Sequence, residues 1–217
     1  MEIRHRIESV FKNCVFDRPL FYTYPGGLRF ELSEGGMVIQ QFLLAIQKAT
    51  LICSDIFPAG ESIAFCFRCR AEKNRFAHRP LLREITKTGI KFSRNRSLWL
   101  EPLDVEEWFE ENEPESWLTL AFDAPQNLIQ SALWCALAID FGSISPRPLC
   151  SVYLVNLTAG IVVFPYDDRG MDVVGPNHER LASIYGKHRK YLLDYDLKKM
   201  EATFGVLQLL NDRPGYQ

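Results

Sequence analysis

The sequence has 217 residues, of which 47% are hydrophobic, 24% charged and 12% aromatic, and its formal net charge is −2. This length and composition predict a globular protein with one large domain, 1–217, and a sizeable core. The small net charge gives no general attraction to nucleic acid, so direct nucleic-acid binding is not expected. The first residues lack the apolar core of a signal peptide, and the apolar run 38–56 is broken by polar residues. We therefore expect a cytoplasmic protein that does not enter a membrane.

The spacing of apolar residues predicts the helices and strands in chain order. The expected helices lie near 3–15, 37–56, 125–139, 177–192 and 197–204, and the expected strands near 28–32, 62–70, 117–122, 151–157, 161–166 and 171–174. A strand–helix–strand unit occurs twice, at 28–70 and 117–157, which would be a structural duplication without repeated residues. A mostly antiparallel sheet with helices packed on one face gives an α+β fold.

The middle of the chain, 71–116, is dense in charge and is expected to be an irregular insertion. Arg and Lys dominate 68–96, whereas 101–123 contains many acids and no base. Two interpretations stay open. The two blocks pair with each other or are solvated, as charge runs usually are. Alternatively, the acidic block is a binding surface anchored by its aromatic residues. The candidate partner-binding residues in it are Glu106, Glu107, Trp108, Glu110 and Glu111.

A β-hairpin with a charged turn is expected between 161 and 174. The turn is Asp167-Asp168-Arg169-Gly170. Aspartate bonds its own backbone in turns, and glycine adopts a positive φ without a steric cost. We therefore expect Gly170 in the left-handed region.

The charged residues at this turn have three interpretations. In the first, Asp167, Asp168 and Asp172 cap and brace the turn, and Arg169 pairs with one of them. In the second, the hairpin tip is a charged recognition surface made of these four residues and Tyr166. In the third, the three aspartates hold Mg²⁺ or Ca²⁺. The fixed positive charge of Arg169 opposes a bound cation.

Other chemical motifs give no sign of a cofactor. The sequence has no phosphate-binding glycine loop, no G-x-S-x-G and no H-E-x-x-H. Cys66 and Cys69 are spaced C-x-x-C, but odd and even residues of a strand point to opposite faces, so no zinc site is expected. His178 and His188 are expected to be satisfied surface or core histidines.

Four stretches together carry a family resemblance. They are the hallmark Tyr166-Asp167-Asp168-Arg169-Gly170-Met171-Asp172-Val173, the strand 28–32, the helix ending at Ile56-Phe57, and the segment 181–196. Together they resemble an uncharacterised bacterial domain family, a domain of unknown function. The resemblance covers 28–70 and 117–204, so 117–205 is the hallmark-bearing half. Pro165 departs from the pattern and predicts an edge strand, because proline cannot donate to a ladder. The resemblance implies an α+β fold and no particular reaction.

These observations favour a non-enzymatic, cytoplasmic bacterial binding protein. Its specific form is an immunity protein that neutralises a basic toxin domain by protein–protein contact, since complementary charge speeds capture. The alternative is a metal-dependent hydrolase or nuclease-like enzyme centred on Asp167, Asp168 and Asp172. A third option is a structural or regulatory subunit. A neighbouring toxin gene would favour the first, and metal retained on purification would favour the second.

Overall fold

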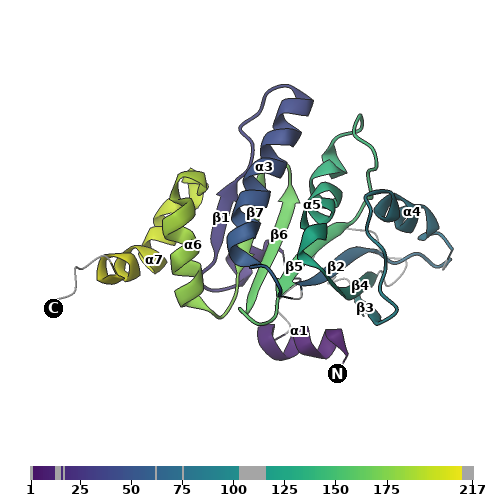
Figure 1. The fold of residues 1–217 in the computed structure, drawn as a ribbon, viewed down its shortest axis with the longest axis horizontal. Coiled ribbons are helices and arrows are strands. Elements are labelled where there is room, and N and C mark those ends of the chain that lie inside the picture. The colour runs from purple at the N-terminus through teal and green to yellow at the C-terminus, as the bar shows by residue number, and fades with distance from the viewer. Residues whose placement is uncertain are drawn as a thin grey trace.

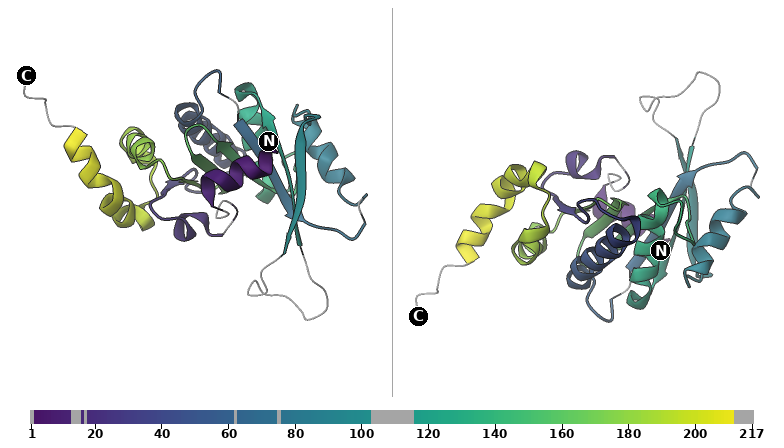
Figure 2. Two further views of the ribbon diagram at one scale, coloured as in Figure 1. Left: turned by 90° about the horizontal axis from the view of Figure 1, so that it is seen from below. Right: turned by 90° about the horizontal axis from the view of Figure 1, so that it is seen from above.

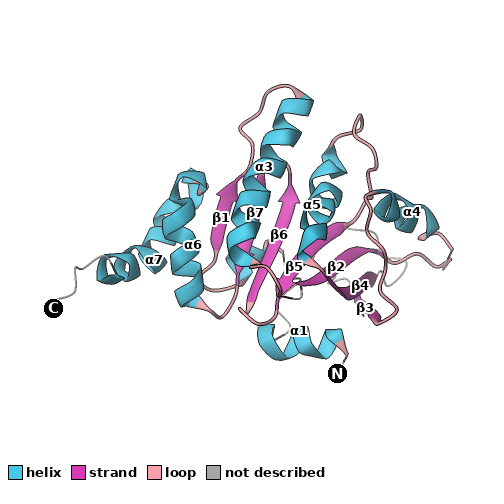
Figure 3. Cartoon of the chain, in the orientation of Figure 1, coloured by secondary structure: helices cyan, strands magenta, loops and turns pink. Residues whose placement is uncertain are grey.

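The computed structural model describes residues 2–12, 16, 18–61, 63–74, 76–102 and 116–211. Within them, seven strands form one antiparallel sheet in the order β1-β7-β6-β5-β2-β4-β3 (Figures 1 and 3). The strands are β1 (Leu28–Glu31), β2 (Ile63–Arg70), β3 (Arg96–Pro102), β4 (Ser116–Ala124), β5 (Ser151–Asn156), β6 (Ile161–Asp167) and β7 (Gly170–Val174). The α-helices are α1 (Ile3–Phe11), α2 (Leu20–Thr23), α3 (Val38–Ile56), α4 (Arg79–Lys87), α5 (Ile129–Leu137), α6 (His178–His188) and α7 (Leu197–Asn211). Short 3-10 turns are η1 (Gln126–Leu128), η2 (Ala138–Asp140), η3 (Arg189–Tyr191) and η4 (Asp194–Asp196). The expected α+β class is confirmed.

The larger core lies between one face of the sheet and α3, α5 and α6. Helix α3 forms because its apolar residues recur every three or four positions, and it buries Phe42, Ala45, Ala49, Ile52 and Ile56 on that stripe. It packs against α5 and α6 as well as the sheet, and Figure 1 shows α3 and α5 crossing this face side by side. This core holds the long central strands in place.

A smaller core covers the opposite face. Helix α1 buries Ile3, Ile7 and Phe11, which lie four residues apart and so on one side of the helix. They pack in a cluster with Trp99 and Tyr153. The expectation of helices on one face therefore holds for α3, α5 and α6, whereas α1 lies on the other face.

Both expected strand–helix–strand units are formed, but they span different distances. The unit β1–α3–β2 passes β7, β6 and β5, whereas β4–α5–β5 passes β2 alone. The two helices pack against each other. The two units thus have the same type of connection on the same face of the sheet, but they pass different numbers of strands.

The charged middle contains more regular structure than expected. Both α4 and β3 lie within 71–116, and β3 pairs with β4 from Arg96↔Phe122 to Pro102↔Ser116. Figure 2 shows these strands at one end of the sheet, opposite α6 and α7. The acidic segment 103–115 lies outside the described residues.

Pro165 does not mark an edge strand, because β6 lies between β7 and β5. The recorded β5–β6 pairs stop at Leu154↔Val163, before the proline. The β6–β7 register also shifts between Pro165 and Asp167. Proline occurs within sheets at such irregularities, because it cannot donate to a regular ladder.

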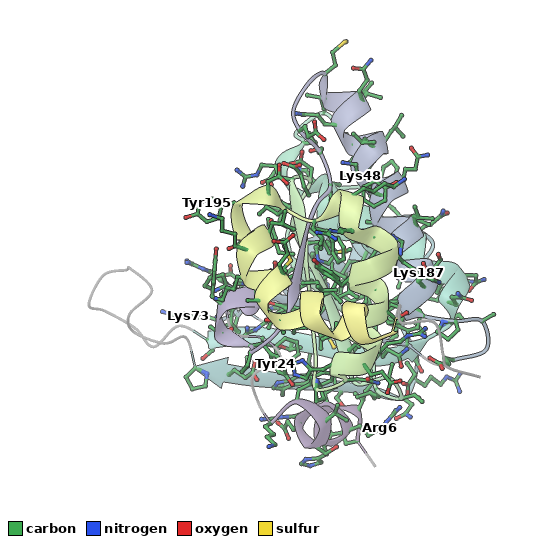
Figure 4. The ribbon with its side chains drawn as sticks, turned by 90° about the vertical axis from the view of Figure 1, so that its left-hand side faces the viewer. Arg6, Tyr24, Lys48, Lys73, Lys187 and Tyr195 are labelled. Carbon is green, nitrogen blue, oxygen red and sulfur yellow. The ribbon has the colours of Figure 1, made fainter. Side chains whose placement is uncertain are left out.

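The C-terminal helices close the β1 side of the sheet. The Leu193 N–H donates to the Arg29 carbonyl at 2.9 Å, so the segment before α7 covers the β1 edge. Helix α6 is joined to α3 by Asp55, whose carboxylate binds Lys187 and His188, both at 2.8 Å. Figure 4 labels Lys187 in a view onto the C-terminal helices. His188 is thus a satisfied core histidine, as expected. In the described part of the chain, no helix is both long and apolar enough to cross a membrane.

Candidate functional site

The expected hairpin is formed by β6 and β7, and Asp167 organises its turn. Asp167 Oδ1 accepts the backbone N–H of Arg169 at 2.9 Å and that of Gly170 at 3.2 Å. Asp167 Oδ2 accepts the Arg169 side-chain Nε–H at 2.9 Å, and the Nη2 of Arg169 also contacts it. One carboxylate therefore satisfies two backbone donors and pairs with the guanidinium.

The prediction that Gly170 adopts a left-handed conformation is wrong, because its φ is not positive. A glycine is needed at this position because a side chain there has no room. A Cβ built on Gly170 would lie 1.8 Å from Tyr166 Oη and 2.3 Å from the adjacent ring carbon. The ring of Tyr166 therefore packs directly against the glycine backbone.

Asp172 belongs to a buried network that also contains Arg29 and Asp196. Arg29 binds Asp172 through Nε and Nη2 at 2.8 and 3.1 Å, a bidentate pair between neighbours in the β1–β7 register. Its Nη1 reaches Asp196 at 3.2 Å. The Phe21 backbone N–H adds a third donor to Asp172 at 3.0 Å. The network ties β1, β7, α2 and the turn η4 before α7 together.

Aromatic rings enclose the guanidinium of Arg29. Its carbon lies 5.0, 4.8 and 5.4 Å from the ring centres of Phe21, Tyr22 and Tyr166. Tyr22 Oη also donates to Asp196 at 2.8 Å. The positive charge thus lies among ring faces and two carboxylates, which together offset its desolvation.

Burial changes the proton affinities in this network. Burial raises the pKa of Asp172, and the hydrogen bonds and charge of Arg29 oppose that shift without cancelling it. Burial alone would lower the pKa of Arg29, but the bonds to Asp172 raise it overall. The hydrogen bond to Asp196 raises the pKa of Tyr22, and burial raises that of Tyr166. These two tyrosines remain neutral hydroxyls at neutral pH.

Asp168 completes the set by accepting the Ser33 hydroxyl at 3.0 Å. All three hairpin aspartates are buried, whereas the side chain of Arg169 is 77% exposed. Each carboxylate has its own internal donors, but only Asp167 binds within the turn, as the first interpretation expects of all three. Asp168 binds Ser33, and Asp172 binds Arg29. Among the described residues, no group of three or more His, Cys, Asp or Glu side chains could hold a metal ion.

Sequence reasoning missed Arg29, Asp196 and Tyr22 as partners of the hairpin. The alternating strand 28–32 places Arg29 on the face expected to meet solvent, and a distant segment covers that face. Asp196 directly precedes the expected helix 197–204, and its side chain binds Tyr22 and Arg29. A usable signal was present: Arg29 and Asp172 are opposite charges at the centres of two short strands, and such charges pair when the strands are adjacent.

The predicted acidic binding residues Glu106, Glu107, Trp108, Glu110 and Glu111 lie outside the described residues. At the border of this segment, Arg68 Nη2 binds Glu101 at 3.1 Å, one pairing between the basic and acidic blocks. Arg68 Nη1 also donates to the Phe16 carbonyl at 2.8 Å.

The strand before the acidic segment is the second edge of the sheet. Within the described ranges, β3 pairs with β4 alone. Its side chains alternate in burial, with Ser97 and Trp99 turned inward and Leu98 and Leu100 turned outward. Leu98 and Leu100 are 61% and 60% exposed. An edge with outward leucines is a template for pairing with another chain.

The fold and the hairpin define an α+β protein in which Asp172 and Asp168 join the β6–β7 hairpin to β1 and to the segment that follows β1. The chain belongs to the family described as "Domain of unknown function (DUF3885)", which matches residues 3–196. That match includes 71–116, which the sequence resemblance left out. No curated protein and no solved structure matches the chain.

Proposed function

We propose that this chain is a non-enzymatic binding protein that captures a protein partner along the β3 edge. The observation that supports it best is the pair of exposed leucines, Leu98 and Leu100, on the strand that forms one edge of the sheet in the described part of the chain. An extended segment of a partner can add to such an edge. Main-chain hydrogen bonds then supply affinity, and contacts with outward side chains supply selectivity.

The charge of the following segment suggests the chemistry of the partner. The acidic segment 103–115 begins where β3 ends, and its neighbours Pro102 and Ser116 form the last pair of the β3–β4 ladder. A dense negative charge that directly follows β3 in the sequence favours a basic partner and speeds its encounter. The finer form of the proposal is an immunity protein, with a basic toxin domain such as a nuclease as its partner.

The alternative, a metal-dependent hydrolase or nuclease-like enzyme, has less support. Its proposed centre is Asp167, Asp168 and Asp172. The carboxylates of these residues already accept hydrogen bonds from Arg169, Ser33 and Arg29. A cation would have to displace these donors or share their oxygens.

The rate at which the partner associates tests whether the acidic segment steers it. The partner is sought first among the products of genes adjacent to the gene for this chain, using the full chain as bait. Reversing Glu106, Glu107, Glu110 and Glu111 to Lys should then slow association at low salt by tenfold or more, since opposite charges no longer steer encounter. The difference should shrink above ~0.1 M salt, where the Debye length is about 10 Å.

Trp108→Ala is the matched variant for docking. An aromatic anchor acts after encounter, so this change should speed dissociation and leave the association rate near that of wild type. If the Lys variant associates at the wild-type rate at every salt concentration, the acidic segment does not steer the partner.

A further inference from the structure

Cys69 and Cys150 lie at corresponding ends of neighbouring strands. In the β2–β5 ladder the last recorded pair is Arg68↔Ser151. Cys150 directly precedes β5, and one further step in the same antiparallel register would bring it opposite Cys69. Directly opposed residues in antiparallel strands have Cα atoms about 4.5–5.5 Å apart, within the range that a disulfide requires. Both cysteines are free thiols here.

The two thiols also share a cavity and a face of the sheet. Cys150 is a member of the larger core and Cys69 packs against it. Both line an open cavity of about 590 Å³, together with His78, Trp117 and Arg147. Cys69 is partly exposed, whereas Cys150 is buried. A small reagent in the cavity would therefore meet Cys69 first, and Cys150 is placed to resolve the product.

His78 is oriented toward the sulfur of Cys69. Its Nε2 accepts the backbone N–H of Glu72 at 3.3 Å, so in the neutral ring the proton is on Nδ1. Nδ1 lies 3.7 Å from Cys69 Sγ, and its N–H therefore donates to the sulfur. A donor at this position favours a negatively charged sulfur. Burial and the charge of Glu72 act in the opposite direction and raise the pKa of Cys69.

We propose that Cys69 and Cys150 form a reversible dithiol–disulfide pair, which a peroxide-class oxidant reaches through this cavity, with His78 as the residue that positions the Cys69 sulfur. The pair lies on the opposite side of β2 from Cys66, which belongs to the second core. Its residues are not those of the braced hairpin, and Cys69 lies two strands from the β3 edge, in the cross-strand row Cys69, Leu118 and Leu100. It adds a redox-sensitive site to the proposed binding function.

The chemistry balances with hydrogen peroxide as the oxidant. The Cys69 thiol loses its proton to water, and the thiolate attacks one peroxide oxygen. The O–O bond breaks, and the departing hydroxide takes up a proton to become water, leaving Cys69 as a sulfenic acid. The Cys150 sulfur, on losing its proton, then attacks the Cys69 sulfur. The S–S bond forms as the S–O bond breaks, and the second hydroxide also becomes water. Two thiols and one peroxide thus give one disulfide and two waters.

The proposal is tested on the full, reduced chain. After brief treatment with hydrogen peroxide, free thiols are blocked with N-ethylmaleimide and the digest is examined without reduction by mass spectrometry. We expect a linked peptide that joins Cys69 to Cys150, the loss of two reactive thiols, and full recovery with dithiothreitol. Because the raised pKa keeps Cys69 largely protonated at neutral pH, formation of the link should speed up as pH rises from 7 to 9.

Variants separate this pair from the other thiols. Cys69→Ser should abolish the link. Cys135→Ser is the matched control, because Cys135 lies in the same core beside the Thr88 hydroxyl and tolerates a hydroxyl group there; it should leave the link intact. His78→Asn should slow formation without changing which cysteines are joined.

The readout on the wild-type chain does not depend on whether a variant folds. A linked peptide that contains Cys135 in place of Cys69 would overturn the proposal. A peroxide-treated wild-type chain without a Cys69–Cys150 peptide at any pH up to 9 would also overturn it.

Discussion

Arg29→Met is expected to lower the free energy of unfolding by about 3–5 kcal/mol, the largest effect of any single change considered. The loss of stability follows from the two buried carboxylates that remain after the guanidinium is removed. Asp172 is 1% exposed and Asp196 is 6% exposed, and both would keep a charge without its cation. Urea unfolding of the two chains at pH 7 measures the difference.

Arg169→Met is the matched control for this prediction. It removes a guanidinium from the same hairpin, but that side chain is largely exposed and pairs with a single carboxylate. An exposed pair contributes at most about 1 kcal/mol. Equal losses for Arg29→Met and Arg169→Met would show that the buried network does not stabilise the fold.

The pH dependence of the Arg29→Met variant gives a second readout. Burial already raises the pKa of Asp172 in the wild-type chain, and removing the guanidinium removes the opposing effect. The folded variant then binds a proton more readily than its unfolded chain, so its stability rises as pH falls toward that raised pKa. The difference in the free energy of unfolding between the variant and the wild type should therefore become smaller as pH falls from 7 toward 5.

Gly170→Ala is expected to cost about 1–3 kcal/mol, because a methyl group there overlaps the Tyr166 hydroxyl. Either the ring must leave its position between Arg29 and the hairpin, or the turn must shift. Gly205→Ala on α7 is the control, since the nearest atom to a Cβ there is 4.0 Å away. In a helix that change should be neutral or stabilising.

A double-mutant cycle identifies the cause of the Gly170 effect. With Tyr166→Ala in the background, the added methyl has room, and most of the cost of Gly170→Ala should disappear. A cost that stays the same in that background would point to backbone conformation instead. A Gly170→Ala chain as stable as wild type would remove the packing argument altogether.

Local sequence patterns predicted the elements that are specified by residues close together in the chain. Helix α3 shows a long apolar stripe, and the hairpin has strong turn chemistry. Helix α6 is capped by Asn177, whose side chain accepts the Arg180 N–H at 3.0 Å. Such signals depend on residues close together in the chain.

Helix α4 and strand β3 could not be predicted in the same way. Helix α4 has a short apolar stripe, in which Ile85 is buried and Leu81 packs against the core, but the basic residues around these two positions hide it in the sequence. In β3 the leucines face outward while Ser97 faces inward, which inverts the usual relation between polarity and burial.

The sequence predicted the turn of the candidate site, but it did not predict the long-range partners of the site's aspartates. The contacts of Asp167 with Arg169 and Gly170 join residues two and three apart, and turn chemistry anticipates them. The pairing of Asp172 with Arg29 joins residues 143 apart, and it depends on β1 lying beside β7. Strand order of this kind is set by the whole fold and cannot be read from a single short pattern.

The affinity of the captured partner for two double variants tests most directly whether the β3 edge is the binding surface. The first variant carries Leu98→Ser and Leu100→Ser. The second is its control and carries Leu43→Ser and Leu51→Ser on α3, where both leucines are also exposed. Loss of two contact leucines should weaken binding by tenfold or more, about 1.4 kcal/mol, while the α3 control binds as wild type does. Unchanged affinity for the Leu98 and Leu100 variant, with loss in the α3 control, would place the partner on α3 and contradict the account.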